Sequence, residues 1–247
     1  MRLDVFFTPN QVKVPDTQGR LVIIVDVLRA STTVATALGN GAKTVIPLEG
    51  PDEVISRSKE FARSQTLLAG EQKMHPISGF DLGNSPQAFT PEVVEGKTIL
   101  LTTTNGTRAL LGVQGARDIV VASYVNFTAV LAMMKVAASS NTDIAIICAG
   151  EEGGFTLEDA ACAGRYVRAI PKRAALAVND AAAASVLIEK KYGDNIAKVF
   201  KESTHGQALE SAGFGDDLAA AAEVDSYPVV PIWQDRQITK LGPERAR

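Results

Sequence analysis

The sequence predicts a three-layer α/β/α protein, in which a largely parallel or mixed sheet of six or more strands lies between two layers of helices. Two observations support this fold class. Short apolar runs rich in β-branched residues recur along the chain, and most of them are followed by a segment with the apolar spacing of a helix. Hydrophobic residues make up 46% of the 247 residues, enough to bury both faces of such a sheet. No linker divides the chain, so we expect one α/β domain over residues 1–247.

In the first half of the chain, strands and helices alternate with few interruptions. An Asn-Gly pair at 40–41 is typical of a helix C-terminus, and Pro51 followed by Asp52 and Glu53 is typical of a helix start. Several prolines and glycines make the stretch 72–95 irregular, and long loops of this kind are often functional. The expected elements are strands at 3–7, 21–25, 44–48 and 67–71, with helices that end near 40 and near 63.

The second half repeats the same alternation. An apolar strand at 98–101 leads through a cluster of hydroxyl side chains to an Asn-Gly-Thr helix entry, much as the strand at 21–25 leads to its own helix. Pro228 and Pro231 predict that the last strand lies at a sheet edge or is irregular. The further expected elements are strands at 118–124, 143–150 and 227–233, with helices from 127, from about 156, from 179 onward, at 195–202 and at 216–222.

Composition and charge exclude several classes of function. A formal net charge of −3 leaves no excess of basic groups for a nucleic-acid backbone, so nucleic acid is not an expected partner. No apolar run is long enough to span a bilayer, and the first residues lack the apolar stretch of a signal peptide. Two cysteines, Cys148 and Cys162, are too few for a disulfide framework, which favours a cytoplasmic protein without a membrane partner.

The stretch LVIIVDVLRASTT, residues 21–33, holds the most informative group of side chains. Its apolar strand ends at Asp26, and Arg29, Ser31 and Thr32 follow where a helix begins. Ligands of open α/β sheets bind beyond the carboxyl ends of strands, so a carboxylate, a guanidinium and hydroxyls at this joint predict a reaction site. In the alternative, structural interpretation, Asp26 only orders a turn and Ser31 only caps the helix.

Familiar catalytic motifs are absent from the sequence. It contains no P-loop, no Gly-x-Gly-x-x-Gly after a strand, no His-Glu-x-x-His and no Gly-x-Ser-x-Gly. Cys162 and Arg168 have the spacing of a cysteine phosphatase loop, but they fall in an expected helix, so we interpret the match as chance. With only His75 and His205 in the chain, a histidine-rich metal site is excluded.

Acidic side chains at strand ends or helix starts are the candidate metal ligands. Carboxylate oxygens suit Mg²⁺, a hard cation that keeps several of its waters. Thr156 and Asp159 also have the spacing of a capping box, and Glu158 fits simple compensation of a helix dipole, so structural roles remain open for both acids. The set comprises Asp26, Glu71, Asp81, Glu151, Glu152, Glu158 and Asp159.

Three expected helix starts offer backbone amides to an anion such as phosphate or sulfonate, although each alone is more typical of a cap. Arg29 adds a bidentate donor, and together with Asp26 these groups favour a small anionic, phosphorylated substrate. His205, expected in a polar turn before a small helix, either stays solvated or protonates a leaving alkoxide. The candidate substrate-binding residues are Ser31, Thr32, Asn84, Ser85, Thr104, Asn105, Gly106 and Thr107.

Short motifs occur in this order over most of the chain: DVLRAST at 26–32, GE at 70–71, GNSP at 83–86, TTNGT at 103–107, CAG at 148–150, EDAACAG at 158–164 and HG at 205–206. Together they resemble the 2-phosphosulfolactate phosphatase family. The resemblance implies an α/β/α fold and a Mg²⁺-dependent phosphatase that converts 2-phospho-3-sulfolactate to 3-sulfolactate on the route to coenzyme M. One departure is that Gln72 stands where the family usually has arginine, which removes one positive charge expected near the substrate.

The working hypothesis is therefore a phosphatase site. Asp26 and Glu71 would hold Mg²⁺ against the phosphate, together with one or both of Glu158 and Asp159. Arg29 and the helix-start amides would bind the phosphate oxygens, and water is the favoured nucleophile, with direct attack by Asp26 as the alternative. The competing class is a non-catalytic binding or regulatory domain for a carboxylated or sulfonated metabolite, whereas the missing glycine fingerprint disfavours a nucleotide-dependent oxidoreductase. A homodimer is a further hypothesis.

Overall fold

The computed structural model describes residues 1–171 and 177–242, and one sheet of 11 strands runs through them. The strands are β1 (Arg2–Phe6), β2 (Leu21–Val25), β3 (Thr44–Pro47), β4 (Thr66–Gln72), β5 (His75–Pro76), β6 (Thr98–Thr102), β7 (Asp118–Ala122), β8 (Ile144–Cys148), β9 (Ala177–Val178), β10 (Pro231–Gln234) and β11 (Gln237–Lys240). Their order across the sheet is β5-β4-β6-β3-β11-β10-β7-β2-β8-β1-β9.

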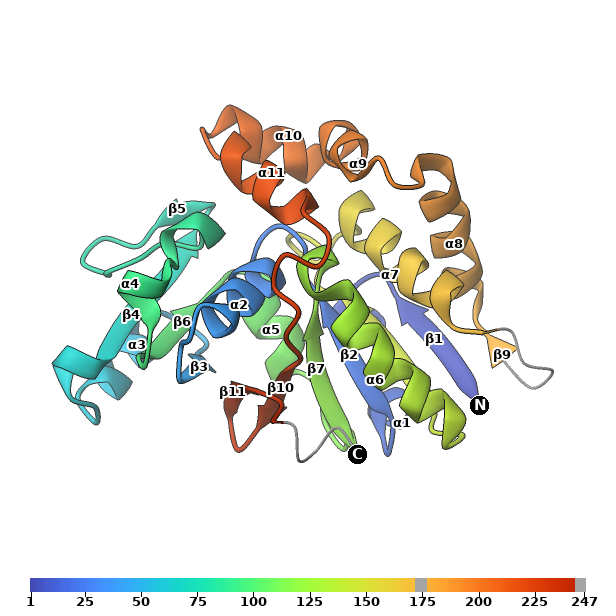
Figure 1. Ribbon diagram of the computed structural model, residues 1–247, viewed down its shortest axis with the longest axis horizontal. Coiled ribbons are helices and arrows are strands. Elements are labelled where there is room, and N and C mark those ends of the chain that lie inside the picture. Colours follow the sequence, from blue (N-terminus) through green and yellow to red (C-terminus); the bar gives the residue numbers. More distant parts are fainter. Residues whose placement is uncertain (172–176, 243–247) are drawn as a thin grey trace.

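Helices cover both faces of this sheet, which confirms the predicted three-layer α/β/α fold (Figure 1). They are α1 (Val14–Thr17), α2 (Ala30–Gly39), α3 (Pro51–Ser58), α4 (Pro91–Val94), α5 (Gly106–Leu111), α6 (Phe127–Ser139), α7 (Leu157–Ala169), α8 (Asp180–Tyr192), α9 (Ile196–Glu202), α10 (Thr204–Ser211) and α11 (Gly215–Ala222). No helix in the described ranges is long and apolar enough to cross a membrane. The prediction of one domain over 1–247 also includes 172–176 and 243–247, which lie outside the described residues.

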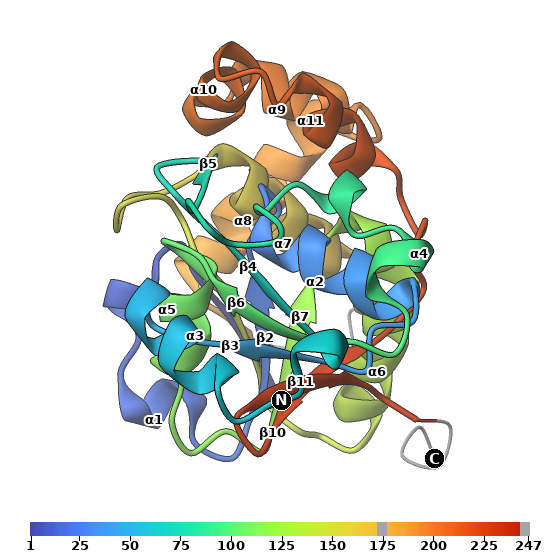
Figure 2. The same cartoon turned by 90° about the vertical axis from the view of Figure 1, so that its left-hand side faces the viewer.

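Apart from the short edge strand β5, which pairs antiparallel with β4, the sheet consists of two parallel blocks joined by an antiparallel hairpin. Strands β4, β6 and β3 form one block, and β7, β2, β8, β1 and β9 form the other. The hairpin β10–β11 pairs antiparallel with β7 on one side and with β3 on the other. Figure 2 shows β3, β6 and β4 running across the direction of β2 and β7. The sheet is therefore mixed.

For the last strand, predicted at 227–233 at a sheet edge or irregular, the irregular character is confirmed at 227–230, whereas the edge position and the start at 227 were wrong. Residues 227–230 have no regular structure, and β10 begins only at Pro231 and lies inside the sheet. Pro231 is compatible with this place because it is the first residue of the strand, where the loss of its N–H costs the ladder least. Similarly, α3 ends at Ser58 instead of near 63, because a separate turn of 3₁₀ helix at Arg63–Gln65 leads into β4.

The central strand β2 is buried along its whole length. Its side chains point alternately to the two faces of the sheet, and each face is covered by an apolar cluster. Ile23 belongs to the same apolar cluster as Tyr166 of α7 and Met134 of α6. Ile24 belongs to the opposite cluster, with Val34 of α2. Burial on both faces explains why the sequence of β2 is a continuous apolar run, and it fixes the position of the residues that follow the strand.

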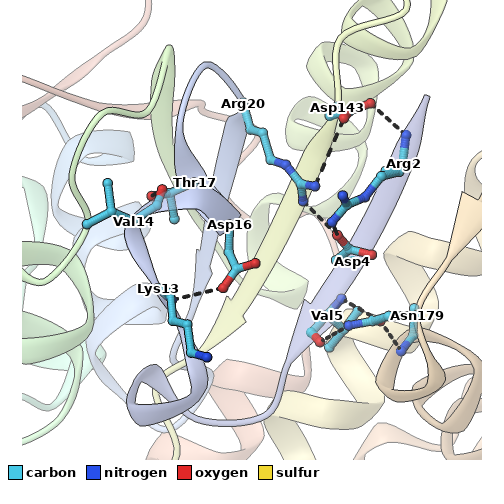
Figure 3. A network of polar contacts seen from close by, with 11 residues as sticks. Arg2, Asp4, Val5, Lys13, Val14, Asp16, Thr17, Arg20, Asp143 and Asn179 are labelled. Atoms are coloured by element: carbon cyan, nitrogen blue, oxygen red, sulfur yellow. Dashed lines mark hydrogen bonds and ion pairs between the residues drawn. The ribbon is translucent and has the colours of Figure 1, made fainter.

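An ionic network centred on the buried residues Asp4 and Arg20 lies at the N-terminal ends of the strands (Figure 3), at the opposite end of β2 from Asp26. The Asp4 carboxylate accepts from Arg20 at 2.8 Å and from Arg2 at 2.7 Å, and Arg2 N–H donates to Asp143 at 2.7 Å. Burial alone would raise the pKa of Asp4, but these arginines outweigh it and hold the pKa below its usual range. The network joins β1 to the start of β2 and to β8, and we interpret it as structural.

Candidate active site

A cavity of about 370 Å³ lies where the chain leaves the C-terminal ends of β2, β6 and β8, beside the β4–β5 hairpin and α10. This is the end of a parallel sheet at which ligands bind. The cavity is lined by charges of both signs, namely the carboxylates of Asp26, Glu71, Glu151 and Glu152 and the cations Arg29, Lys73 and His205. It brings together residues that are far apart in the sequence.

Asp26 follows β2 directly and is 6% exposed. Its Oδ1 accepts the backbone N–H of Ala30 at 3.1 Å, and its own N–H donates to Ser31 Oγ at 2.9 Å. The other oxygen, Oδ2, has no hydrogen-bond partner among the described residues. Burial raises the pKa of Asp26 to about 6, in spite of the opposing charge of His205. This places a carboxylate that titrates near neutral pH in the cavity wall.

Gly106 at the start of α5 packs directly on the Asp26 carboxylate. A Cβ at this position would lie 2.6 Å from Asp26 Oδ2 and 2.7 Å from the Ala30 Cβ. Only glycine therefore lets the segment after β6 approach the end of β2 this closely. Gly106 was predicted to bind substrate, and the geometry gives it the different task of bringing two strand ends together.

Glu71, in β4, fixes two segments of the cavity wall. Its Oε1 accepts the N–H of Thr104 at 2.7 Å, and its Oε2 accepts the N–H of Met74 at 2.9 Å. The side chain is 8% exposed and still lines the cavity. One carboxylate thus connects the β4–β5 hairpin to the segment that follows β6.

His205 and Glu158 form a buried pair at the cavity edge. Ser203 caps α10 by accepting the Gly206 N–H at 2.9 Å, so His205 lies in the first turn of the helix and is 8% exposed. The prediction that His205 lies in a polar turn before the helix was wrong, because α10 begins at Thr204, one residue before His205. His205 Nδ1 lies 3.0 Å from Glu158 Oε1, and its Nε2 lies 3.8 Å from Oε1 of the cavity residue Glu151. The ring therefore presents Nε2 to the cavity.

Glu158 controls the charge of this histidine. Burial lowers the pKa of His205, but the hydrogen bond and the charge of Glu158 outweigh burial and raise the pKa to about 9. His205 therefore keeps its proton at neutral pH. Glu158 is 1% exposed, and its Oε2 has no hydrogen-bond partner in the described part of the chain. The arrangement gives Glu158 an orienting role toward His205.

Asp159 holds two strand ends together. Its Oδ1 accepts the N–H of Val27 at 2.8 Å and its Oδ2 accepts the N–H of Gly150 at 3.1 Å. The capping-box alternative for Thr156 and Asp159 was wrong, since α7 has no side-chain cap and the carboxylate is used elsewhere. Burial raises the pKa of Asp159 well above its usual range, and the neighbouring Asp26 adds to this rise.

The four predicted metal ligands do not converge on one point. Among the described residues, no group of three or more His, Cys, Asp or Glu side chains is placed to hold a metal ion. Of the four, Asp26 and Glu71 line the cavity, while Glu158 and Asp159 are bonded outside it. Mg²⁺ is commonly held by only one or two carboxylates together with substrate phosphate and water, so the pair that lines the cavity fits this cation.

Arg29 lines the cavity but donates mainly within the protein. Its NH1 binds Asp217 of α11 at 2.7 Å, its NH2 binds the Met74 carbonyl at 2.7 Å, and its guanidinium lies 4.2 Å from the centre of the Phe214 ring. Ser85, a predicted substrate ligand, donates a short hydrogen bond to the other oxygen of Asp217. Arg29 and Ser85 thus hold α11 against the cavity wall.

We expect Arg29→Lys to act more on stability than on substrate binding. Lysine reaches Asp217 as a point charge but cannot also serve Met74 and stack on Phe214, so the free energy of unfolding should fall by about 2 kcal/mol, less than for loss of a whole buried pair. Chemical denaturation measures this change, and steady-state kinetics should show a smaller rise in KM. A large rise in KM at unchanged stability would instead assign Arg29 to the substrate.

The predicted anion site at the start of α2 is occupied by the protein itself. Asp26 takes the Ala30 N–H through its side chain and the Ser31 N–H, at 2.8 Å, through its carbonyl. The Thr32 hydroxyl donates to the Val27 carbonyl at 2.7 Å and contacts Ser123, also at 2.7 Å. Ser31 and Thr32 are each 1% exposed, and their hydroxyls shape the turn after β2.

The other two predicted helix starts contribute more directly. Asn84 is 5% exposed, and its side-chain Oδ1 has no partner in the described ranges although Asn84 lines the cavity. Thr104 and Asn105 line it as well, and Asn105 Oδ1 accepts the N–H of Glu152 at 3.1 Å. Thr107 instead exchanges hydrogen bonds with Thr103 at 3.2 Å and closes the turn before α5. Asn84 therefore has the side chain best placed to meet a ligand.

Sequence reasoning missed several cavity residues. Lys73 and Met74 come two and three residues after Glu71, and their place in a hairpin turn was the signal that could have found them. Thr103 lay within a motif already noted, whereas no local signal connects Asp217 to Arg29, 188 residues away. Gln72, where the family usually has arginine, is exposed at the end of β4, and the residue after it, Lys73, lines the cavity.

A three-layer α/β fold with a cavity of mixed charge beyond its strand ends defines a class of protein, the α/β enzymes that handle a small polar ligand. The 2-phosphosulpholactate phosphatase family model matches residues 6–236. A probable 2-phosphosulfolactate phosphatase of Caldanaerobacter subterraneus is 38% identical over 231 residues, covering 94% of this chain and 95% of the relative. Proteins of the same name from Symbiobacterium thermophilum and Clostridium acetobutylicum are 39% and 32% identical, covering 90% and 96% of this chain and 95% and 100% of theirs. The chain belongs to the 2-phosphosulfolactate phosphatase family.

Proposed function

We propose that this protein is a phosphoric monoester hydrolase that removes phosphate from 2-phospho-3-sulfolactate with Mg²⁺ as cofactor. Membership of the family and the names of its relatives support the reaction and the substrate. The observation that carries the proposal is the cavity itself, because it joins two carboxylates, Asp26 and Glu71, to a protonated histidine at converging strand ends. These are the groups needed to hold a phosphate ester and to assist its leaving group.

The charges of the cavity support a divalent cation. Two of its cations, Arg29 and His205, are already paired with the buried carboxylates Asp217 and Glu158, so they offer a substrate little uncompensated positive charge. An anionic ester would then meet mostly carboxylates. Asp26 and Glu71 would hold Mg²⁺, which when bound would neutralise the phosphate and orient it for in-line attack. The free Oδ2 of Asp26 supports this assignment.

His205 supplies the proton for the leaving group in this proposal. Water attacks phosphorus, the bond from phosphorus to the ester oxygen breaks, and the Nε2 proton passes to that oxygen to give the alcohol. Asp26 Oδ2 is assigned to the cation, so the proton that the attacking water loses passes to an oxygen of the phosphate product. Asn84, Thr103 and Thr104 line the cavity and orient the ester through hydrogen bonds.

A phosphate-release screen tests the function. We expect the protein to release phosphate from 2-phospho-3-sulfolactate with Mg²⁺ and to lose this activity when EDTA removes the metal. Lactate 2-phosphate serves as the comparison substrate. Binding of the ester in calorimetry without Mg²⁺ and without phosphate release would instead identify a non-catalytic binding module.

We expect Glu158→Gln to move the pH profile of the enzyme. In the wild type, the basic limb of kcat/KM should fall near pH 9, where His205 loses its proton. Glutamine keeps a hydrogen bond but removes the charge of Glu158, so the pKa of His205 should fall, while the charges of Glu151 and Asp26 still raise it. The basic limb should therefore move to lower pH. An unmoved limb would separate Glu158 from the function of His205.

The pair of His205 and Glu158 makes stability depend on pH. The pKa of His205 is raised from 6.5 to about 9 in the folded protein, so the pair stabilises the fold fully below pH 6.5, and this contribution is lost as the pH rises through about 9.

Cytoplasmic location and a homodimer stay predictions. Gel filtration with light scattering would test the homodimer.

A further inference from the structure

Lys73 differs from the other cations of the cavity in having no carboxylate partner. Arg29 lies 2.7 Å from Asp217 and His205 lies 3.0 Å from Glu158, and both of these carboxylates are buried. Lys73 lines the same cavity, but within 1–171 and 177–242 it forms no ion pair and no side-chain hydrogen bond. It is therefore the cation of the cavity whose charge is left for a ligand.

The backbone holds Lys73 in this place in an unusual conformation. Strands β4 and β5 pair Glu71 with Pro76 and Gln72 with His75, which leaves Lys73 and Met74 as a two-residue turn. Both have positive φ, 49° and 71°, as in a type I′ turn, where Asn and Gly are the favoured residues. Lysine is not among the residues that this conformation favours.

Cavity residues fix this turn from two sides. Glu71 Oε2 accepts the Met74 N–H at 2.9 Å, and Arg29 NH2 donates to the Met74 carbonyl at 2.7 Å. The turn is thus tied to the same side chains that form the wall near Asp26. Lys73 is exposed and lines the cavity, and it forms no side-chain bond to the described residues, so its ammonium is available to an anion there.

We propose that Lys73 binds the sulfonate of the substrate and so selects sulfonated over unsulfonated phosphate esters. This inference rests on the proposed function. A sulfonate presents three equivalent oxygens, which suit the three rotating donors of an ammonium, whereas the planar carboxylate suits the fork of an arginine. With Mg²⁺ at Asp26 and Glu71 taking the phosphate, Lys73 provides the separate positive charge that the third anionic group requires.

Kinetics on three esters tests this assignment. Phosphosulfolactate carries both a carboxylate and a sulfonate, lactate 2-phosphate lacks the sulfonate, and 2-sulfoethyl phosphate lacks the carboxylate. We expect Lys73→Met to lower kcat/KM for the two sulfonates about 10-fold more than for lactate 2-phosphate, mainly through KM, as for loss of a hydrogen bond to a charged group. Lys135→Met, an exposed lysine of α6 outside the cavity, is the matched control and should leave all three values unchanged.

An equal loss on all three esters, or no loss on any, would overturn the proposal. A second measurement tests the role of Lys73 even if the protein releases phosphate from none of the three esters. That outcome would by itself refute the proposed function. Calorimetry with 3-sulfolactate and with lactate then compares the wild type with Lys73→Met. Weaker binding of 3-sulfolactate only, by about 10-fold, supports the role of Lys73. Equal binding by the two proteins, or no binding by the wild type, contradicts it.

Discussion

Asp26→Asn is expected to lower kcat/KM for phosphate release by more than about 1,000-fold, the size typical of losing a member of a catalytic unit. Asp26 lies at the end of the central strand, lines the cavity and keeps one carboxylate oxygen free. Asparagine preserves the shape and the bond to the Ala30 N–H, but it removes the negative charge that would hold the cation.

The fold should survive this substitution or gain from it. Burial raises the pKa of Asp26 to about 6, so above that pH the folded protein carries a buried charge that it does not favour. A group whose pKa is raised from 3.8 to about 6 on folding makes the protein less stable at pH 8 than a neutral group would. In EDTA at pH 8, the Tm of Asp26→Asn should therefore equal or exceed that of the wild type.

Asp81→Asn provides the control for charge. Asp81 belongs to the same acidic set in the sequence, but it pairs with Arg63 and accepts the Leu68 N–H outside the cavity. This variant should keep nearly full activity, with its fold checked by circular dichroism. Normal turnover by Asp26→Asn would remove Asp26 from the mechanism, and a fall in its Tm together with activity would show that the loss was structural.

The alternation of strands and helices could be predicted from the sequence because it depends on local patterns. The apolar run at 21–25 is buried on both faces, and its length and place were predicted correctly. The hairpin β10–β11 could not be placed, since its insertion between β7 and β3 depends on pairing with strands more than a hundred residues earlier. Pro231 even suggested the edge, because the rule concerns lost N–H groups and not strand order.

In the candidate site too, positions that depend on local patterns could be predicted, whereas contacts between distant parts of the chain could not. Asp26 and Glu71 were identified from their positions at strand ends, and both line the cavity. Glu158 and Asp159 are adjacent in α7, yet one binds His205 and the other binds the N–H groups of Val27 and Gly150. Helical geometry sends neighbouring side chains in different directions, so only the packing of α7 decides which carboxylate reaches which partner. From the sequence, one or both were expected on a metal, with structural roles as the alternative.

His205→Gln is expected to lower kcat for phosphosulfolactate by about 100-fold to 10,000-fold, the range of a general acid. Glutamine fills the same space and reaches Glu158, but it has no proton to give at neutral pH. The wild-type histidine keeps its proton because its pKa is raised to about 9. Rapid quench or continuous phosphate detection at pH 7 measures the effect.

The nature of the leaving group separates proton donation from a general effect on the site. The alkoxide of sulfolactate is a strong base and needs a proton as it departs, whereas an aryl phosphate such as p-nitrophenyl phosphate releases a stable phenolate without one. His205→Gln should therefore lose far more activity on the alkyl ester than on the aryl ester. An equal loss on both would mean that His205 holds the phosphate or the fold instead of protonating the leaving oxygen. Because Glu158→Gln keeps the histidine and lowers its pKa, that variant should lose activity on the alkyl ester at pH 8 and recover toward wild-type activity as the pH falls, a recovery that His205→Gln cannot show.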